Sequence, residues 1–297
     1  MLQKWLDDAI ADDEIHKIPL EEITKGDAIG AGSFGNVYLG FYKLTRIVLK
    51  KIKKCHIKGK EKDSFLAFIK ELKIHSALKH ENIIPLYGIC ESKSRNSYYL
   101  VMQFANNGTL REFLKKSSET LTWDKKISLA MEIAEVHENH IKIADFGLSK
   151  DINSIPSSPS GMGLTPYLDP KMLEDNEYKK DKRSDIYSLG VLFWEISNCR
   201  TPFEGYNGLA LVRKIIDRDE LREDPSTNTP PEYVRLYKDC WQLEPEDRPL
   251  IEKVCSRLES ISKVFTQNIL HGTHDIFNEN TFTTSQTEQQ VIKSLYI

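Results

Sequence analysis

Residues 30–37 read G-A-G-S-F-G-N-V and have the glycine spacing G-x-G-x-x-G-x-V. Because glycine has no Cβ, two strands joined by such a turn form a flap whose backbone can approach a phosphate group closely. Dinucleotide-binding domains use a similar spacing, but in them a helix follows the glycines. Here the residues after Gly35 have the pattern of a strand, which favours the phosphate flap; an ordinary glycine hairpin is the alternative.

A lysine on an apolar strand is the second chemical feature. Lys50 follows the apolar residues 47–49, and an ammonium group on a central strand is costly unless it is paired. Glu71 lies in a segment with helical periodicity, residues 64–78, and is the expected partner. Either charge alone would more often lie on the surface. The prediction therefore depends on the order of flap, lysine and glutamate along the chain.

A carboxylate that could bind a metal follows at Asp145, in the triplet D-F-G. Mg²⁺ prefers hard oxygen ligands, which makes Asp145 the candidate metal ligand. The triplet alone is common, so the interpretation depends on the whole run of residues 141–150.

These side chains need a framework of strands followed by helices, which is an α+β arrangement. A short helix over residues 1–12 is expected to dock on the domain, with a free partner-binding helix as the alternative. The strand patterns cover residues 27–40 (two strands and a glycine turn), 46–53 and 97–104. The helical patterns cover residues 64–78, 110–114, 123–135, 185–197, 209–216, 231–241 and 250–261.

Four further motifs accompany these features: H-x-N-I at 80–83, G-T-L at 108–110, D-P-K at 169–171 and C-W at 240–241. With them the chain resembles the eukaryotic protein kinase family over residues 19–262, and within it the tyrosine-kinase-like branch. The resemblance implies a two-lobed α+β fold with a small β-rich N-lobe and a larger α-helical C-lobe. It also implies transfer of the γ-phosphoryl group of ATP to a protein Ser/Thr or Tyr hydroxyl, with Mg²⁺ as the metal.

The resemblance divides the chain into four parts. Residues 1–17 are an N-terminal helix or extension, residues 18–105 the N-lobe and residues 106–262 the C-lobe. Residues 263–297 are rich in Thr, Gln, Asn and Ser with little periodicity, which is typical of a flexible tail.

Three residues receive catalytic roles from the resemblance. Lys50 would contact the α- and β-phosphates, Glu71 would hold Lys50 in place, and Asp145 would bind Mg²⁺. The residues expected to bind ATP are Ile29, Gly30, Ala31, Gly32, Ser33, Phe34, Gly35, Val37, Val48, Lys50, Met102, Gln103, Ala105 and Asp145.

The adenine base is expected between Val37 and Val48, with Met102 as the gatekeeper and with backbone groups offered by Gln103 and Ala105. Val48 stands where the family usually has alanine, so the resemblance predicts a tighter pocket.

One part of the family pattern is missing. No H-R-D-x-x-x-x-N segment occurs in the 297 residues, although this loop carries the catalytic base and the second Mg²⁺ ligand. Residues 123–135 look like the start of a long helix, and residues 136–143 look like the strands just before D-F-G. Family members place roughly two dozen residues between these pieces. The junction of Glu135 and Val136 therefore looks like an internal deletion, from a skipped exon or an incorrect gene model.

Loss of this loop has chemical and structural consequences. A positioned base contributes about 10²–10⁴-fold to a rate, so transfer is expected to be impaired. Asp185 resembles the aspartate that anchors the loop and is expected to be an unpaired buried charge. Lys171 stands where the family has the glutamate that pairs with Arg248, which leaves the partner of Arg248 open. The alternatives are a nucleotide-binding pseudokinase or scaffold, and a truncated product without function.

Composition limits the partners. With 41 basic and 44 acidic residues, nothing indicates binding to nucleic acid, and no apolar stretch is long enough to span a membrane. The five scattered cysteines suit reduced thiols in a cytoplasmic protein. The expected partners are ATP and a protein substrate or partner kinase.

Overall fold

The computed structural model describes residues 2–32, 35–52, 61–79, 83–92, 97–106, 108–135, 141–143, 165–175, 177–216, 223–272 and 291–293. The chain divides into two compact units, one built on Met1–Asn106 and the other on Asn107–Ile141 and Lys150–Lys293. The first holds a five-stranded antiparallel sheet and the second is mainly helical, so the expected two-lobed α+β fold is confirmed.

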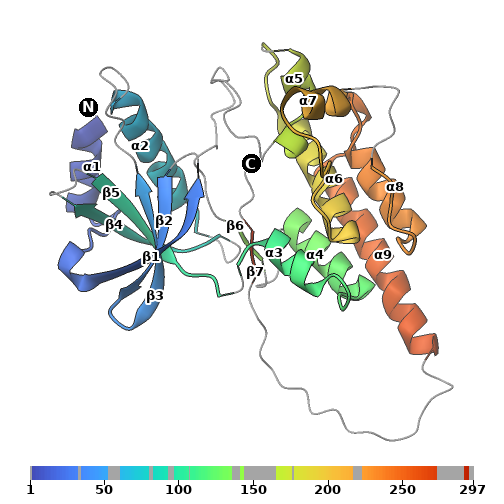
Figure 1. Ribbon diagram of the computed structural model, residues 1–297, viewed down its shortest axis with the longest axis horizontal. Helices are drawn as coiled ribbons and strands as arrows, with labels where there is room; N and C mark the ends of the chain where they lie inside the picture. The colour runs from blue at the N-terminus through green and yellow to red at the C-terminus, as the bar shows by residue number, and fades with distance from the viewer. Residues whose placement is uncertain are drawn as a thin grey trace, which may run out of the picture. The chain divides into compact units, whose positions relative to one another are not determined.

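The sheet of the first unit has the strand order β1-β2-β3-β5-β4, which leaves β1 and β4 at its edges (Figure 1). Its strands are β1 (Ile23–Gly32), β2 (Gly35–Tyr42), β3 (Thr45–Ile52), β4 (Leu86–Ser92) and β5 (Ser97–Gln103). The other elements of this unit are α1 (Leu2–Ala11), η1 (Leu20–Glu22) and α2 (Glu61–Ala77).

The two faces of this sheet follow from the alternation of side chains along each strand. One face carries a cluster of buried residues: Ile18, Ile23, Ile47, Leu49, Cys90, Tyr99 and Val101. The opposite face packs against α2, where the ring of Phe68 stacks on that of Tyr98 at 5.3 Å between centroids. Because both faces are covered, six consecutive residues of β5 are buried.

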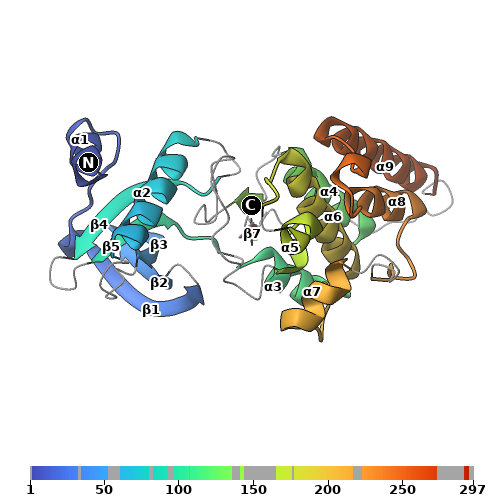
Figure 2. The same ribbon diagram turned by 90° about the horizontal axis from the view of Figure 1, so that it is seen from above.

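The second unit is arranged around α6 (Lys182–Asn198), most of whose residues are buried. The aromatic side chains of Trp194 on α6 and Trp241 just after α8 meet at 6.2 Å between ring centroids. Figure 2 shows the helices of this unit from above. The remaining elements are α3 (Leu110–Ser117), α4 (Trp123–Glu135), β6 (Ile141–Ile143), η2 (Thr165–Tyr167), α5 (Pro170–Glu174), α7 (Gly208–Ile216), α8 (Pro231–Cys240), η3 (Pro245–Asp247), α9 (Ile251–Gly272) and β7 (Val291–Lys293).

Two sequence-based expectations need correction. Helix α9 continues to Gly272, so residues 263–272, which were expected in the flexible tail, are helical. Asp185 is not an unpaired buried charge. It lies in the first turn of α6, where its side chain is 44% exposed and its Oδ1 is 3.0 Å from Lys180 Nζ.

Candidate functional site

A buried ion pair joins α2 to β3 in the first unit. Lys50 Nζ donates to Glu71 Oε1 at 2.7 Å, and the two side chains are only 5% and 4% exposed. The hydrophobic alternation of β3 places Lys50 on the face of the sheet that α2 covers, and the helical period of α2 turns Glu71 toward it. The structure thus brings together two of the residues that the sequence singled out.

An apolar surface surrounds this lysine on the same face of the sheet. Val37 stands directly opposite Lys50, and Val48 stands opposite Met102. Directly opposed residues of antiparallel strands share a face, and so do residues two apart on one strand. Val37, Val48, Lys50 and Met102 therefore line one surface, which offers a cation for a phosphate group and apolar side chains for a planar base.

The glycine flap is formed by β1 and β2, whose register pairs Gly30 with Val37 and Gly32 with Gly35. A Cβ at Gly30 would lie 3.8 Å from the Val37 side chain, which is an ordinary contact. Packing within the chain therefore does not require glycine at this position, whereas close approach of a ligand would.

The remaining predicted site residues are placed as follows. Ile29 is 50% exposed on β1, and Ala31 pairs with Asn36. The Gln103 N–H donates to the Pro85 carbonyl at 3.0 Å, so a contribution of Gln103 to a base would come from its own carbonyl. Ala105 follows β5 and is partly buried. Ser33, Phe34 and Asp145 lie outside the described residues.

His75 is a residue of this region whose contact the sequence patterns did not predict. Its Nε2 donates to the Ile84 carbonyl at 2.7 Å, and the side chain is 2% exposed. This bond ties the last turn of α2 to the segment before β4. The sequence does offer one sign of such a contact, because His75 is a polar residue on the helical stripe that also holds Phe68 and Leu72.

In the second unit, Arg248 has a carboxylate partner after all. Its two terminal nitrogens donate to Asp169 at 2.7 and 2.8 Å, and both side chains are fully buried. Its remaining hydrogen bonds go to the backbone carbonyls of Arg183, Gln242 and Leu243. Lys171 instead contacts Glu244 at 2.9 Å, so the charges of the D-P-K motif have separate partners.

The Asp169 carboxylate is held in its ionised form. Burial alone would raise its pKa, but the hydrogen bonds from Arg248 and Ser184 and the positive charge of Arg248 outweigh burial and lower the pKa. Ser184 Oγ donates to Oδ2 at 2.7 Å and the Lys171 N–H to Oδ1 at 3.0 Å. Both carboxylate oxygens are therefore engaged.

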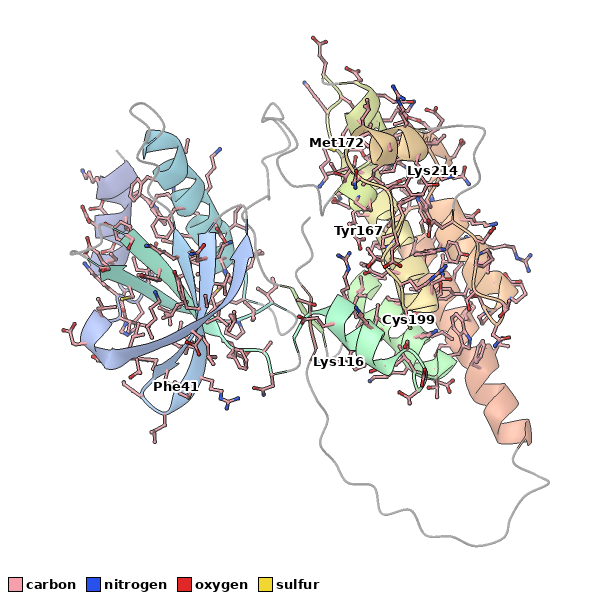
Figure 3. The ribbon with its side chains drawn as sticks, viewed as in Figure 1. Phe41, Lys116, Tyr167, Met172, Cys199 and Lys214 are labelled. Atoms are coloured by element: carbon pink, nitrogen blue, oxygen red, sulfur yellow. The ribbon has the colours of Figure 1, made fainter. Side chains whose placement is uncertain are left out.

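A second network in this unit joins α3, η2 and α6. Arg111 donates to Glu195 at 2.9 Å and to the Tyr167 hydroxyl at 2.6 Å, and that hydroxyl donates to Glu195 at 2.5 Å (Tyr167 is labelled in Figure 3). Burial and the charge of Glu195 raise the pKa of Tyr167. The network fixes the three elements to one another.

Comparison with known proteins decides the family. The chain matches the family described as protein tyrosine and serine/threonine kinase in two consecutive segments, residues 23–137 and 136–258. The chain belongs to this kinase family. The matched segments include Lys50, Glu71 and the Asp169–Arg248 pair.

Relatives of this kinase chain are named as serine/threonine-protein kinases or as a mitogen-activated protein kinase kinase kinase. It is 27% identical to a "probable LIM domain-containing serine/threonine-protein kinase" of Dictyostelium discoideum, over 83% of this chain and 40% of that protein. It is 29% identical to a "mitogen-activated protein kinase kinase kinase" of Drosophila melanogaster, over 88% of this chain and 24% of that protein. The similarity thus spans less than half the length of either relative.

Both alignments are longer than the part of the kinase chain that they cover. The first spans 274 positions, whereas 83% of 297 residues is about 247. The second spans 296 positions, whereas 88% of 297 residues is about 261. About 27 and 35 positions of these relatives therefore stand opposite gaps in this chain.

Within the described part of the chain, every helix is too short or too polar to cross a membrane.

Proposed function

We propose that this chain is a nucleotide-binding protein kinase domain of the tyrosine-kinase-like branch, in which phosphoryl transfer is impaired. The observation that carries nucleotide binding is the buried pair of Lys50 and Glu71 at 2.7 Å. A buried ammonium group fixed by one carboxylate, beside an apolar surface and a glycine flap, is suited to a ligand with a phosphate and a base.

The described residues have the chemistry that ATP needs. Lys50 would neutralise phosphate oxygens, with Glu71 holding its ammonium group in place. Val37 and Val48 would cover the base, with Met102 at the back of the pocket. ATP supplies the phosphoryl group to be transferred, and Asp145 is proposed to hold its Mg²⁺.

A break in the match to the kinase family supports the proposal of impaired transfer. The two segments that match the kinase family meet at residues 136–137. The two relatives have about 27 and 35 positions without a counterpart here, which is enough for the roughly two dozen residues expected in and around the catalytic loop. We therefore propose that a segment with the H-R-D loop is absent, and with it the base and the second metal ligand.

A binding role without transfer is the second candidate. The Asp169–Arg248 and Arg111–Glu195 pairs of the second unit are formed although no H-R-D segment is present. These contacts support a folded pseudokinase that binds nucleotide or a partner kinase, over a truncated product without function. We propose residues 18–105 and 106–262 as its two lobes.

Thermal melting with and without Mg-ATP tests nucleotide binding. At an ATP concentration 100-fold above Kd, binding adds about 2.7 kcal/mol to the free energy of unfolding, which raises Tm by several degrees. Lys50→Ala is expected to lose this shift. Lys116→Ala, an exposed change on α3, is the matched control and should keep it.

A double variant separates loss of binding from loss of stability. Lys50→Ala leaves Glu71 as an uncompensated buried charge, whereas Lys50→Met with Glu71→Leu replaces the pair by apolar groups of similar size. The double variant should melt near the unmodified chain and show no ATP shift. An ATP shift that persists in it would refute the site.

A further inference from the structure

Residues 2–18 form a strap that consists of α1 and the segment after it, and the strap extends the sheet at its β4 edge. The Ile18 N–H donates to the Ile89 carbonyl at 2.8 Å, and the Ile89 N–H donates to the His16 carbonyl at 2.9 Å. Lys17 forms a parallel bridge with Ile89. The Lys17 ammonium also contacts Glu91 at 2.9 Å, and Ile18 is buried.

Gly88 shapes the β4 edge to receive the strap. Its φ of +149° is rare for residues with a side chain, and a Cβ at this position would lie 2.1 Å from the His16 carbonyl oxygen. The strap could not keep this place against β4 with any other residue at position 88. The absence of a side chain at Gly88 is therefore what allows the backbone of the strap to lie against β4.

Helix α1 of the strap packs against α2, as the views in Figures 1 and 2 agree. Leu6 and Ala9 are 1% and 2% exposed, so the apolar side of α1 is covered. The Lys73 ammonium lies 4.3 Å from the centre of the Trp5 ring, a cation–π contact between the two helices. Lys73 is two residues beyond Glu71 on α2.

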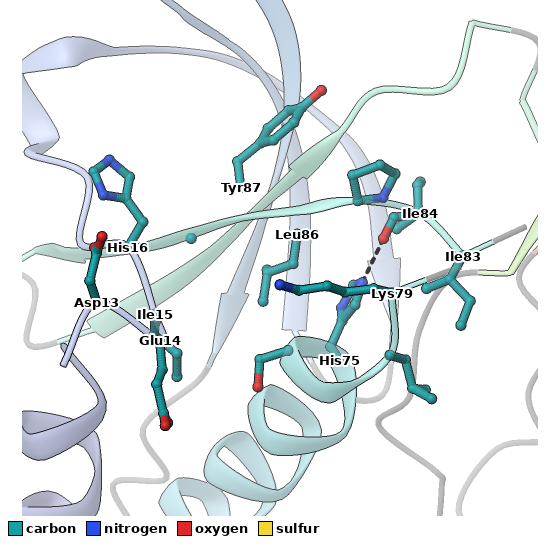
Figure 4. Close-up of a pocket in the computed structure, with 14 residues that line it drawn as sticks. Asp13, Glu14, Ile15, His16, His75, Lys79, Ile83, Ile84, Leu86 and Tyr87 are labelled. Carbon is teal, nitrogen blue, oxygen red and sulfur yellow. Dashed lines mark hydrogen bonds between the residues drawn. The ribbon is translucent and has the colours of Figure 1, made fainter. Parts of the chain in front are cut away.

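A pocket of about 650 Å³ separates the rest of the strap from the last turn of α2 (Figure 4). Its wall is formed by strap residues 13–16, by residues 75, 76, 78 and 79, and by residues 83–88. His75 reaches from α2 to the Ile84 carbonyl at this pocket. The strap therefore contacts α2 through α1, at Lys73, and leaves space beside the C-terminal end of α2.

We propose that the strap is a positioning element for the nucleotide site. Docked on the β4 edge and on α2, it holds α2 where Glu71 meets Lys50. Release of the strap would let α2 move and would weaken nucleotide binding without any change to a residue of the nucleotide site. The effect of the strap on nucleotide binding rests on the proposed function, whereas its hold on α2 does not.

Hydrogen exchange of the full chain tests the hold on α2. In the variant Trp5→Ala with Leu6→Ala, amides of residues 65–77 should exchange about tenfold faster or more, since local opening of α2 costs less free energy. Amides of α8, in the other unit, serve as the internal standard and should not change. Leu44→Ala, at a fully exposed side chain, is the matched control and should leave α2 unchanged.

A milder variant distinguishes a local effect on α2 from general unfolding of the first unit. Lys73→Met removes the cation and keeps the aliphatic stem, and should raise exchange in α2 by a smaller factor. The proposal is overturned if the amides of residues 16–18 exchange faster in the double variant while α2 keeps its protection. It is also overturned if Lys73→Met leaves α2 unchanged while the double variant unfolds the whole first unit.

Nucleotide affinity is measured on the same variants with a fluorescent ATP analogue, and we expect about a tenfold weaker Kd for the strap variant. If the unmodified chain binds no nucleotide, the proposed function fails, yet the exchange experiment still decides whether the strap holds α2. If nucleotide binds equally well to both chains, the link from the strap to the site is refuted.

Discussion

At the scale of single residues, the two charged side chains of the D-P-K motif, Asp169 and Lys171, are expected to contribute unequally to stability because their partners differ. Asp169 satisfies Arg248 through two hydrogen bonds, and both side chains are fully buried. Removal of one partner of such a pair leaves an uncompensated buried charge, which costs about 3–5 kcal/mol. Asp169→Asn should therefore lower the free energy of unfolding by about this amount in denaturant titrations. Lys171→Ala, at a side chain 20% exposed beside Glu244, should cost less than about 1 kcal/mol.

The same aspartate predicts a pH dependence. Its pKa in the folded chain is lowered from the ordinary value of 3.8, so its contribution to stability is complete above that value. The contribution is lost as the pH falls through the lower pKa of the folded state. Melting between pH 5 and pH 2 should thus show a steeper decline for the unmodified chain than for Asp169→Asn, and equal slopes would contradict the assignment.

At the scale of elements, α6 and α8 approach each other at Gly190. A Cβ there would lie 2.8 Å from the Trp241 backbone nitrogen and 2.9 Å from the Cys240 Cβ, so the helices would have to separate. Gly190→Ala should therefore cost about 1–3 kcal/mol, as overpacking does in other cores. Ser260→Ala, on the exposed side of α9, is the control, and equal losses in chemical denaturation would refute the close contact.

The elements also show how far sequence patterns reach. Helix α4 was expected over 123–135 and is found there, because its apolar period is long and regular. Helix α5 has five residues, too few to show a period, and the end of α9 was placed about ten residues early because the sequence changes composition before the helix ends. The partners of Arg248 and His75 could not be predicted, since each depends on how distant segments pack.

At the scale of the whole molecule, the proposed impairment of phosphoryl transfer can be tested at the junction of Glu135 and Val136. Insertion of a relative's segment with H-R-D-x-x-x-x-N at this junction should raise phosphate transfer from labelled ATP to a protein acceptor by about 10²–10⁴-fold. The matched control is the same insertion with H-R-N in place of H-R-D. A 297-residue chain that transfers phosphate as fast as the restored one would contradict impaired catalysis.

Gly88 has a consequence for the history of this chain. Glycine at this position is needed for two separate reasons, its φ of +149° and the His16 carbonyl that lies against the β4 edge. Homologous chains without the strap lose only the second reason, so they should keep glycine wherever β4 keeps this backbone conformation. A homologous chain with a larger residue at the equivalent site should therefore have neither this strap contact nor this backbone conformation of β4, whereas a glycine there does not by itself indicate a strap.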